Sequence, residues 1–226
     1  MNQVVKNIVR ADRTLVEKFA ATGESASIYE IMKKGAMSSD MRPIWPGMRM
    51  CGTALTVHTR PGDNLMLHKA IDMVQPGEVI VLDCEGFTEA GGMFGGMMAA
   101  SLKCKGCAGL VTNGSVRDTM SIKELGLPVF SCGVNIKCST KANGGTINHP
   151  VIVCGVQINP GDIIFGDNDA VVVIPKEIAQ QVYEGTAARE AREDAMLKRI
   201  LAGEGTTFDL MFKEAYESLC LSEDEQ

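Results

Sequence analysis

The chain has 226 residues, of which 45% are hydrophobic and 22% are charged, and its net charge is −6. One large domain accounts for this length, and the apolar fraction excludes an intrinsically disordered chain. The acidic balance does not indicate nucleic-acid binding, and no apolar run approaches the roughly 20 residues that cross a bilayer. Charges throughout the first 20 residues do not fit a secretory signal, so we expect a soluble cytoplasmic protein that binds neither nucleic acid nor membranes.

The amino-terminal region, residues 1–35, is predicted to be helical, because apolar side chains recur at helical spacing over residues 5–22 and 26–34. Short β-rich runs separated by Gly and Pro begin near residue 50. They predict a strand over residues 52–59, a helix over 64–74 and a buried strand over 79–84.

The middle of the chain continues this alternation with a Gly-rich loop that leads into a helix, GGMFGGMMAASLKCK. A strand, a helix and a strand are then predicted over residues 108–114, 118–125 and 127–132. Such an alternation predicts an α/β sheet with parallel strands.

After Cys132 the pattern becomes all-β, and the segment over residues 149–175 is predicted to hold three short strands, with turns at residues 159–162 and 166–169. The carboxyl-terminal region, residues 176–220, is predicted to be helical and begins with a long charged helix over 176–201. Because no linker or internal repeat interrupts the chain, residues 1–226 are predicted to form one domain.

The eight cysteines lie mostly in apolar stretches, which is typical of small buried side chains in a reducing compartment. Cys104 and Cys107 form a CxxC pair, but no second pair and no histidines follow at the spacing of a zinc finger. We therefore do not expect a zinc site.

Chemistry is predicted where the strand over residues 108–114 runs into Arg117 and Asp118. Parallel strands place ligand-binding residues at their carboxyl ends, and the Gly-rich helix start would bring an anion-binding helix terminus to the same edge. Arg117 offers a planar fork to a carboxylate, and Asp118 offers hard oxygens to Mg²⁺. The residues alone leave open the alternative of a surface ion pair in which Asp118 caps the next helix.

Four blocks of the sequence are informative together: CGTALTVHTRPGDNLMLHKAIDMVQPGEVIVLD, FGGMMAASLKCKGCAGLVTNGSVRD, LPVFSCG and PVIVCGVQINPGDIIFGDNDAVVVIP. In order and spacing, these blocks resemble the RraA-like family. That family includes the regulator of ribonuclease activity A and metal-dependent 4-hydroxy-4-methyl-2-oxoglutarate / 4-carboxy-4-hydroxy-2-oxoadipate aldolases. The resemblance implies an α/β/β/α sandwich around a small β-barrel-like core. It also implies a homotrimer or a dimer of trimers with its active site at the subunit interface.

The aldolase branch is the more similar one, because it keeps the Arg-Asp pair seen here as Arg117 and Asp118. The resemblance implies that Asp118 is the direct protein ligand of Mg²⁺ or Mn²⁺. Arg117 and the backbone at the Gly-rich helix start would hold the pyruvate part of the substrate, through Gly95, Gly96, Met97 and Met98.

A carboxylate from the late helix of a neighbouring subunit is also implied, as a hydrogen-bond partner of the metal's water ligands. Glu193 is the best match, and Glu190, one turn earlier, is the fallback. The alternative for both side chains is an ordinary solvated helix face.

Three positions depart from the family's aldolases. Gly96, Asn113 and Ser121 stand where those enzymes often carry acids. Each lost carboxylate removes a group that orients metal-bound water, a change that weakens metal affinity or activity by roughly 10–100-fold.

Two functions therefore remain open from the sequence. One is a divalent-metal-dependent lyase that cleaves a 4-hydroxy-2-oxo acid to pyruvate and decarboxylates oxaloacetate, with Arg117, Asp118 and Glu193 as catalytic residues. The other is a non-catalytic regulatory protein like the ribonuclease regulator. No lysine in the motif is placed to form a Schiff base, which favours the metal-dependent route within the lyase hypothesis.

Overall fold

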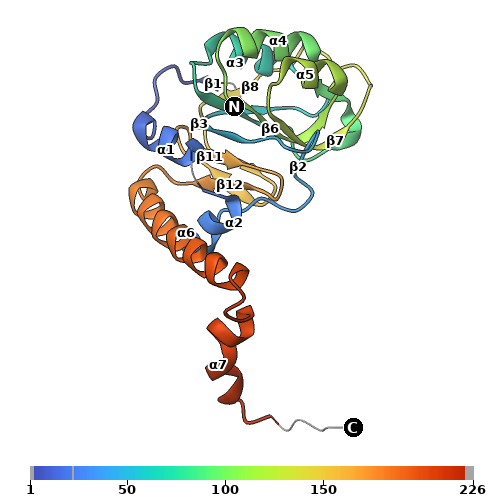
Figure 1. Ribbon diagram of the computed structural model, residues 1–226. Helices are drawn as coiled ribbons and strands as arrows, with labels where there is room; N and C mark the ends of the chain where they lie inside the picture. Colours follow the sequence, from blue (N-terminus) through green and yellow to red (C-terminus); the bar gives the residue numbers. More distant parts are fainter. Residues whose placement is uncertain (1–2, 22, 222–226) are drawn as a thin grey trace. The chain divides into compact units, whose positions relative to one another are not determined.

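The computed structural model describes residues 3–21 and 23–221 (Figure 1). The chain divides into two compact units, Met1–Thr186 and Ala187–Gln226. In the described part of the chain, all strands and the three hydrophobic clusters belong to the first unit. The assignment of the whole chain to one domain stays a prediction.

The first unit is built on a sheet whose strands lie in the order β1-β8-β3-β4-β6-β7-β2. Its central members β3, β4, β6 and β7 are parallel, as the alternating pattern predicts. The strands of this path are β1 (Gln3–Val4), β2 (Arg42–Pro43), β3 (Met50–Thr59), β4 (Glu78–Asp83), β6 (Gly109–Val116), β7 (Val129–Val134) and β8 (Gly145–Ile147). Short β5 (Gly92–Phe94) pairs with β6.

Three helices connect the parallel strands and cover one face of the sheet (Figure 1). They are α3 (Leu65–Met73), α4 (Gly96–Cys104) and α5 (Thr119–Leu125). Their apolar side chains pack against inward-facing residues of the sheet such as Leu55, Ile80 and Leu110, all at most 1% exposed.

A second β layer packs on the opposite face of the sheet. It contains β9 (Val151–Val153), β10 (Val156–Ile158), β11 (Ile163–Gly166) and β12 (Val171–Ile174). Alternate residues of β12 point to opposite sides, as expected of a strand buried on both faces. Val171 and Val173 join the cluster against the sheet, and Val172 and Ile174 join the cluster beneath the outer helices.

The outer helical layer consists of α1 (Arg13–Ala21), α2 (Ser25–Met32) and the first turns of α6 (Ala179–Leu201). Phe19 and Ile28 are its most deeply buried aromatic and aliphatic contacts. The first residues of β3 pair with β11, so the sheet continues into the second layer there. The last residues of β3 pair with β8 of the main sheet path. The predicted α/β/β/α sandwich is thereby confirmed.

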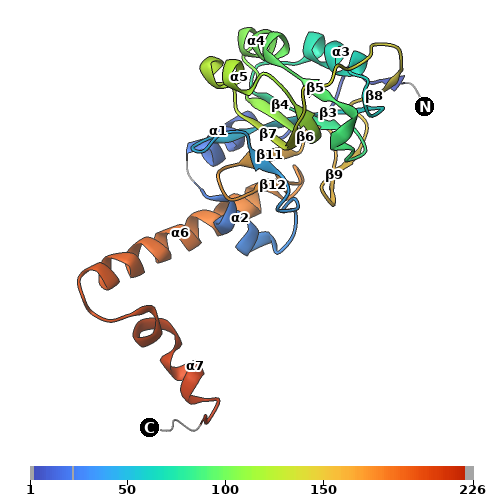
Figure 2. The ribbon, with the colours of Figure 1, turned by 90° about the vertical axis from the view of Figure 1, so that its right-hand side faces the viewer.

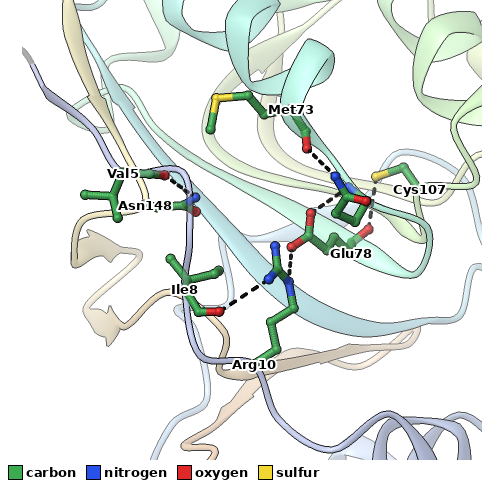
Figure 3. A network of polar contacts seen from close by, with 8 residues as sticks. Val5, Ile8, Arg10, Met73, Glu78, Cys107 and Asn148 are labelled. Atoms are coloured by element: carbon green, nitrogen blue, oxygen red, sulfur yellow. Dashed lines mark hydrogen bonds and ion pairs between the residues drawn. The ribbon is translucent and has the colours of Figure 1, made fainter.

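The helix predicted over residues 5–22 is wrong in its first half, because α1 begins only at Arg13. Before it, Val5 and Ala11 donate backbone hydrogen bonds to Ile147 and Gly161 along the sheet. Arg10 Nε also lies 2.6 Å from Oε1 of Glu78, a carboxylate buried at the start of β4 (Figure 3). Tertiary pairing of this segment overrides its amphipathic pattern. Residue 22 lies outside the described residues.

The three strands predicted after residue 148 are four, because Cys154 and Gly155 form a two-residue turn between β9 and β10. Strand β9, the first strand of this hairpin, is labelled in Figure 2. Both residues have positive φ, 47° and 82°. That is the backbone of a tight hairpin turn, where Asn or Asp usually precedes Gly. Cys in that place hid the turn from the sequence pattern.

The second unit contains the end of α6, a π-helical turn at Phe208–Phe212 and α7 (Lys213–Glu217). The long helix predicted over residues 176–201 is confirmed from Ala179 onward. Within residues 187–221 no side chain is fully buried. None of the helices in the described ranges has the length and apolar character needed to cross a membrane.

Candidate active site

The Arg117-Asp118 pair lies directly after β6 and before α5, at the carboxyl edge of the parallel strands. Asp118 has φ 59° and ψ 37°, a left-handed backbone that is uncommon outside Gly, Asn and Asp. This turn stops the strand and directs both side chains to the cavity described below. The two side chains are 39% and 48% exposed, and Arg117 Nε lies 3.9 Å from Asp118 Oδ2.

Asp118 does not cap α5 with its side chain, although it occupies the N-cap position. Its Oδ2 instead accepts a hydrogen bond of 3.0 Å from the backbone N–H of Gly96, the first residue of α4. The capping alternative is therefore wrong, and the carboxylate faces the Gly-rich helix start.

Gly95 makes this approach possible. A Cβ on Gly95 would lie 2.6 Å from Asp118 Oδ2, closer than real side chains allow. The first turn of a helix has N–H groups without intrahelical acceptors, so α4 presents donors and its positive dipole end at this point.

One cavity of about 190 Å³ gathers most of the predicted site. Of the predicted residues, Gly95, Met97, Met98, Arg117 and Asp118 line it. Gly96 takes part through its bond to Asp118. The Gly-rich helix start and the Arg-Asp turn thus meet at one place, as the strand-end argument predicts.

The same cavity is lined by Asn64, His68 and Lys141, which the sequence argument missed. Asn64 immediately precedes α3, and Lys141 lies in the loop that leads to β8. Asn64 is only 5% exposed and donates from Nδ2 to the Met93 carbonyl at 2.9 Å. The turn RPGDN and the polar run STKANGG were the available signals, but neither matches a known catalytic pattern.

Asp63 holds these two segments together. Its Oδ2 accepts hydrogen bonds from the Thr140 hydroxyl at 2.8 Å, the Ala142 N–H at 2.7 Å and the Asn143 N–H at 3.0 Å. Its Oδ1 accepts from the Leu65 N–H at 3.1 Å. Burial alone would raise the pKa of Asp63, but these donors outweigh it and hold the pKa far below its usual value.

The electrostatics of the cavity suit an anionic ligand. Arg117 and Lys141 supply two cations, and Asp118 supplies one carboxylate. Desolvation and the Lys141 charge lower the pKa of His68, so its imidazole is neutral at pH 7. Two cationic groups beside one carboxylate favour a small ligand with more than one negative charge.

A divalent cation has one protein carboxylate available here. Among the residues that the structure describes, no group of three Asp, Glu, His or Cys side chains could hold a metal ion. Mg²⁺ often keeps several waters and binds proteins through one or two carboxylates. The donor set therefore fits a mostly hydrated Mg²⁺ or Mn²⁺ on Asp118, and it does not fit a fully protein-coordinated ion.

Two of the three departures from the family lie beside Asp118. A Cβ on Gly96 would lie 3.3 Å from the Ser121 Cβ and 3.6 Å from the Asp118 Cβ. Asn113 instead lines a separate cavity of about 660 Å³ and donates to Asp83 Oδ1 at 2.8 Å. Acids at positions 96 and 121 would therefore border Asp118.

Glu193 and its fallback Glu190 belong to α6 in the second unit. Glu193 Oε1 lies 2.5 Å from Arg189 Nη2, one turn earlier on the same helix. The lining of the cavity comes entirely from the first unit, so a role for either carboxylate there stays a prediction.

Two curated relatives share an aldolase name. A protein of Halalkalibacterium halodurans, named provisionally as a 4-hydroxy-4-methyl-2-oxoglutarate aldolase, is 38% identical over 171 residues, covering 74% of this chain and 80% of its own. The 4-hydroxy-4-methyl-2-oxoglutarate aldolase of Thermus thermophilus is 30% identical over 114 residues, covering 50% of this chain and 69% of its own.

A solved structure shares the fold, but its description refers to ribonuclease inhibition and not to an aldolase. Streptomyces coelicolor RraAS2, described as an unusual member of the RNase ES inhibitor RraA protein family, superposes with a TM-score of 0.73 at 26% identity. The similarity covers 84% of this chain and 98% of that one. The RraA-like family model, described as Aldolase/RraA, matches residues 25–173, which include every residue that lines the cavity. The chain belongs to the RraA-like family.

Proposed function

We propose that this protein is a divalent-metal-dependent lyase that cleaves a small 4-hydroxy-2-oxo acid and releases pyruvate. The observation that carries the proposal is the meeting of Arg117, Asp118 and the N-terminus of α4 in one cavity. The aldolase names of the two relatives support the same reaction class.

The substrate class follows from the size and charge of the cavity. Its volume of about 190 Å³ is below the roughly 300–1,000 Å³ of sites for drug-sized ligands, so it suits a molecule of few heavy atoms. Arg117 binds the carboxylate beside the 2-oxo group, since a guanidinium can donate two parallel hydrogen bonds. Lys141 is left for a second carboxylate at the other end of the substrate.

Asp118 holds Mg²⁺ or Mn²⁺ through its carboxylate. When bound, the ion supplies Lewis-acid stabilisation of negative charge on the 2-oxo group. The Gly96 N–H fixes the Asp118 carboxylate, and Arg117 adds positive charge beside the oxygen where the negative charge develops.

The reaction removes the proton of the 4-hydroxyl and breaks the bond between C3 and C4. The electron pair of that bond leaves as the enolate of pyruvate, and the other fragment leaves with a new carbonyl. Protonation of the enolate carbon completes pyruvate. Oxaloacetate reaches the same enolate by loss of CO₂, so its decarboxylation belongs to the proposal.

A second copy of the chain completes the site in this proposal, in a homotrimer or a dimer of trimers. Glu193 from that copy orients the water that accepts the hydroxyl proton. Large apolar side chains on α4, on α5 and after β7 support burial by a partner: Met97, Met120 and Ile136 are 85%, 70% and 86% exposed.

The test is an assay of pyruvate release with Mn²⁺, over a panel of branched 4-hydroxy-2-oxo acids and oxaloacetate. We expect activity that a chelator abolishes and added metal restores. Light scattering is the companion measurement, because a stable monomer would remove the role assigned to Glu193. If the oligomer is saturated with metal and releases no pyruvate from any substrate of the panel, the lyase proposal is overturned.

A non-catalytic regulatory role is the second candidate. It is favoured by Gly96 and Ser121, because the carboxylates missing there would border Asp118. The ribonuclease-inhibitor description of the Streptomyces structure suggests the partner class for this alternative. Inhibition of a ribonuclease by a protein that turns over none of the panel would support it.

A further inference from the structure

Two cysteines face each other in the wall of the 660 Å³ cavity, away from the candidate active site. Cys132 lies in β7, and Cys154 is the first residue of the two-residue turn between β9 and β10. Their sulfur atoms are 3.2 Å apart, within hydrogen-bond distance for thiols. A disulfide has an S–S length of about 2.05 Å, so the sulfurs need to approach by about one further ångström.

Small solutes can reach this pair. Both thiols are partly exposed and line the cavity, whereas Cys84 and Cys107 are buried. The cavity is of a size that admits small molecules. Structural cysteines are expected in closed apolar surroundings, whereas Cys132 and Cys154 border an open cavity.

The backbone at Cys154 is a second, independent observation. The turn needs positive φ at both central residues, and Cys adopts it at 47° without the local hydrogen bonding that makes Asn or Asp suitable. Uncommon backbone states at residues other than glycine are concentrated at functional positions. Here the unusual residue is also the one whose sulfur touches Cys132.

The two thiols are not equivalent. The contact with the Cys154 sulfur lowers the pKa of Cys132, even though burial and the Asp40 carboxylate oppose the shift. The pKa of Cys154 is raised by the same contact and by burial. Asp83 and Glu85 are the other charged groups that line the cavity. Cys132 is therefore the more acidic thiol of the pair, and Cys154 is the less acidic one.

A metal site is a weaker explanation of the pair. A structural zinc needs four ligands, and in the described part of the chain no third Cys, His, Asp or Glu completes a group with these two. Reversible oxidation needs only the two thiols.

We propose that Cys132 and Cys154 are a redox-active dithiol that forms an intramolecular disulfide by exchange with a low-molecular-weight disulfide. The Cys132 thiolate attacks one sulfur of that disulfide, forms a mixed disulfide and releases one thiolate. The Cys154 thiol then loses its proton and attacks the Cys132 sulfur, which releases the second thiolate. Two protein thiols are oxidised, one external disulfide is reduced, and the new bond joins the β9–β10 hairpin to β7.

Trypsin separates the two cysteines cleanly. Cleavage after lysine places Cys132 alone in the peptide of residues 124–137 and Cys154 alone in the peptide of residues 142–176. The full-length reduced protein is incubated with oxidised glutathione, its free thiols are alkylated, and the digest is analysed by mass without reductant. We expect these two peptides joined, with the loss of two hydrogen atoms, and their separation after treatment with a thiol reductant.

Serine variants give the order of events. Cys154→Ser removes the second attack and should accumulate glutathione on Cys132, whereas Cys132→Ser should give neither the linked peptide nor comparable glutathione on Cys154. Cys104→Ser and Cys220→Ser remove exposed thiols outside the pair and should leave the linkage unchanged. Absence of the linked peptide while exposed cysteines react overturns the proposal, as does linkage of Cys132 or Cys154 to other cysteines in equal amount.

Discussion

The backbone N–H of Gly96 donates a hydrogen bond of 3.0 Å to Oδ2 of Asp118, and this contact joins the N-terminus of α4 to the end of β6. Within the described residues 3–21 and 23–221 no group hydrogen-bonds to the other oxygen, Oδ1. One oxygen is therefore held by the protein, and under the proposed function the other binds the divalent cation.

Asp118→Asn should reduce metal-stimulated pyruvate release by at least about 100-fold, because the change removes the only carboxylate among the described residues that line the cavity. Asn keeps an acceptor for the Gly96 N–H and tolerates the left-handed backbone, so the melting temperature should change little. Asp72→Asn, on the exposed side of α3, is the matched control and should keep full activity. Equal activity of the two variants would contradict the metal role.

Arg117→Lys should lower kcat/KM by about 10–100-fold, because lysine keeps the charge but cannot donate two parallel hydrogen bonds to a carboxylate. Steady-state kinetics with the best substrate of the panel measures this effect. A KM increase alone would indicate uniform binding, whereas a loss in kcat would place Arg117 beside the developing charge. Unchanged kinetics would refute both roles.

Gly96→Asp should strengthen Mn²⁺ binding by about 10–100-fold, since it restores a carboxylate beside Asp118. The space is tight but open: the new Cβ would lie 3.3 Å from the Ser121 Cβ. An acidic residue is also favourable in the first turn of a helix. Calorimetric titration of Mn²⁺ into the variant, with Gly96→Asn as the uncharged control, measures the change. Identical affinities for the two variants would contradict this placement.

Asp63→Asn should destabilise the protein by about 1–3 kcal/mol at neutral pH, because an amide nitrogen at the Oδ2 position would meet only donors. The folded-state pKa of Asp63 is depressed, so its stabilisation is present above the ordinary value of about 3.9 and is lost as the pH falls below it. Urea titrations of both proteins should therefore differ most near pH 7 and converge in acid. A pH-independent difference would contradict the ionised network.

The fold could be predicted from sequence where local patterns and tertiary pairing agree. The parallel strands and the helices between them have strong signals, such as the apolar run that becomes β4. Local pattern and tertiary pairing disagree at residues 5–12, where hydrogen bonds to Ile147 and Gly161 decide the conformation. The local pattern also fails at Cys154, because the turn there has an unusual first residue.

The candidate site could be predicted where its residues are neighbours in sequence. Arg117, Asp118 and the Gly-rich helix start follow directly from the rule that strand ends gather ligands. Asn64 and Lys141 are 77 positions apart and meet through Asp63, a side-chain network that no periodicity reveals. Long-range polar contacts of this kind become visible only in three dimensions.

The left-handed backbone at Asp118 restricts how this position can evolve. Only Asp, Asn and Gly adopt φ near 59° at small cost, so Glu is not an equivalent replacement there. The genetic code separates Asp from Asn by one base. Under the proposed function, loss of the carboxylate that binds the cation is therefore a single mutational step that preserves the turn, the helix contact and the fold. A lineage could exchange catalysis for pure binding without passing through an unstable intermediate.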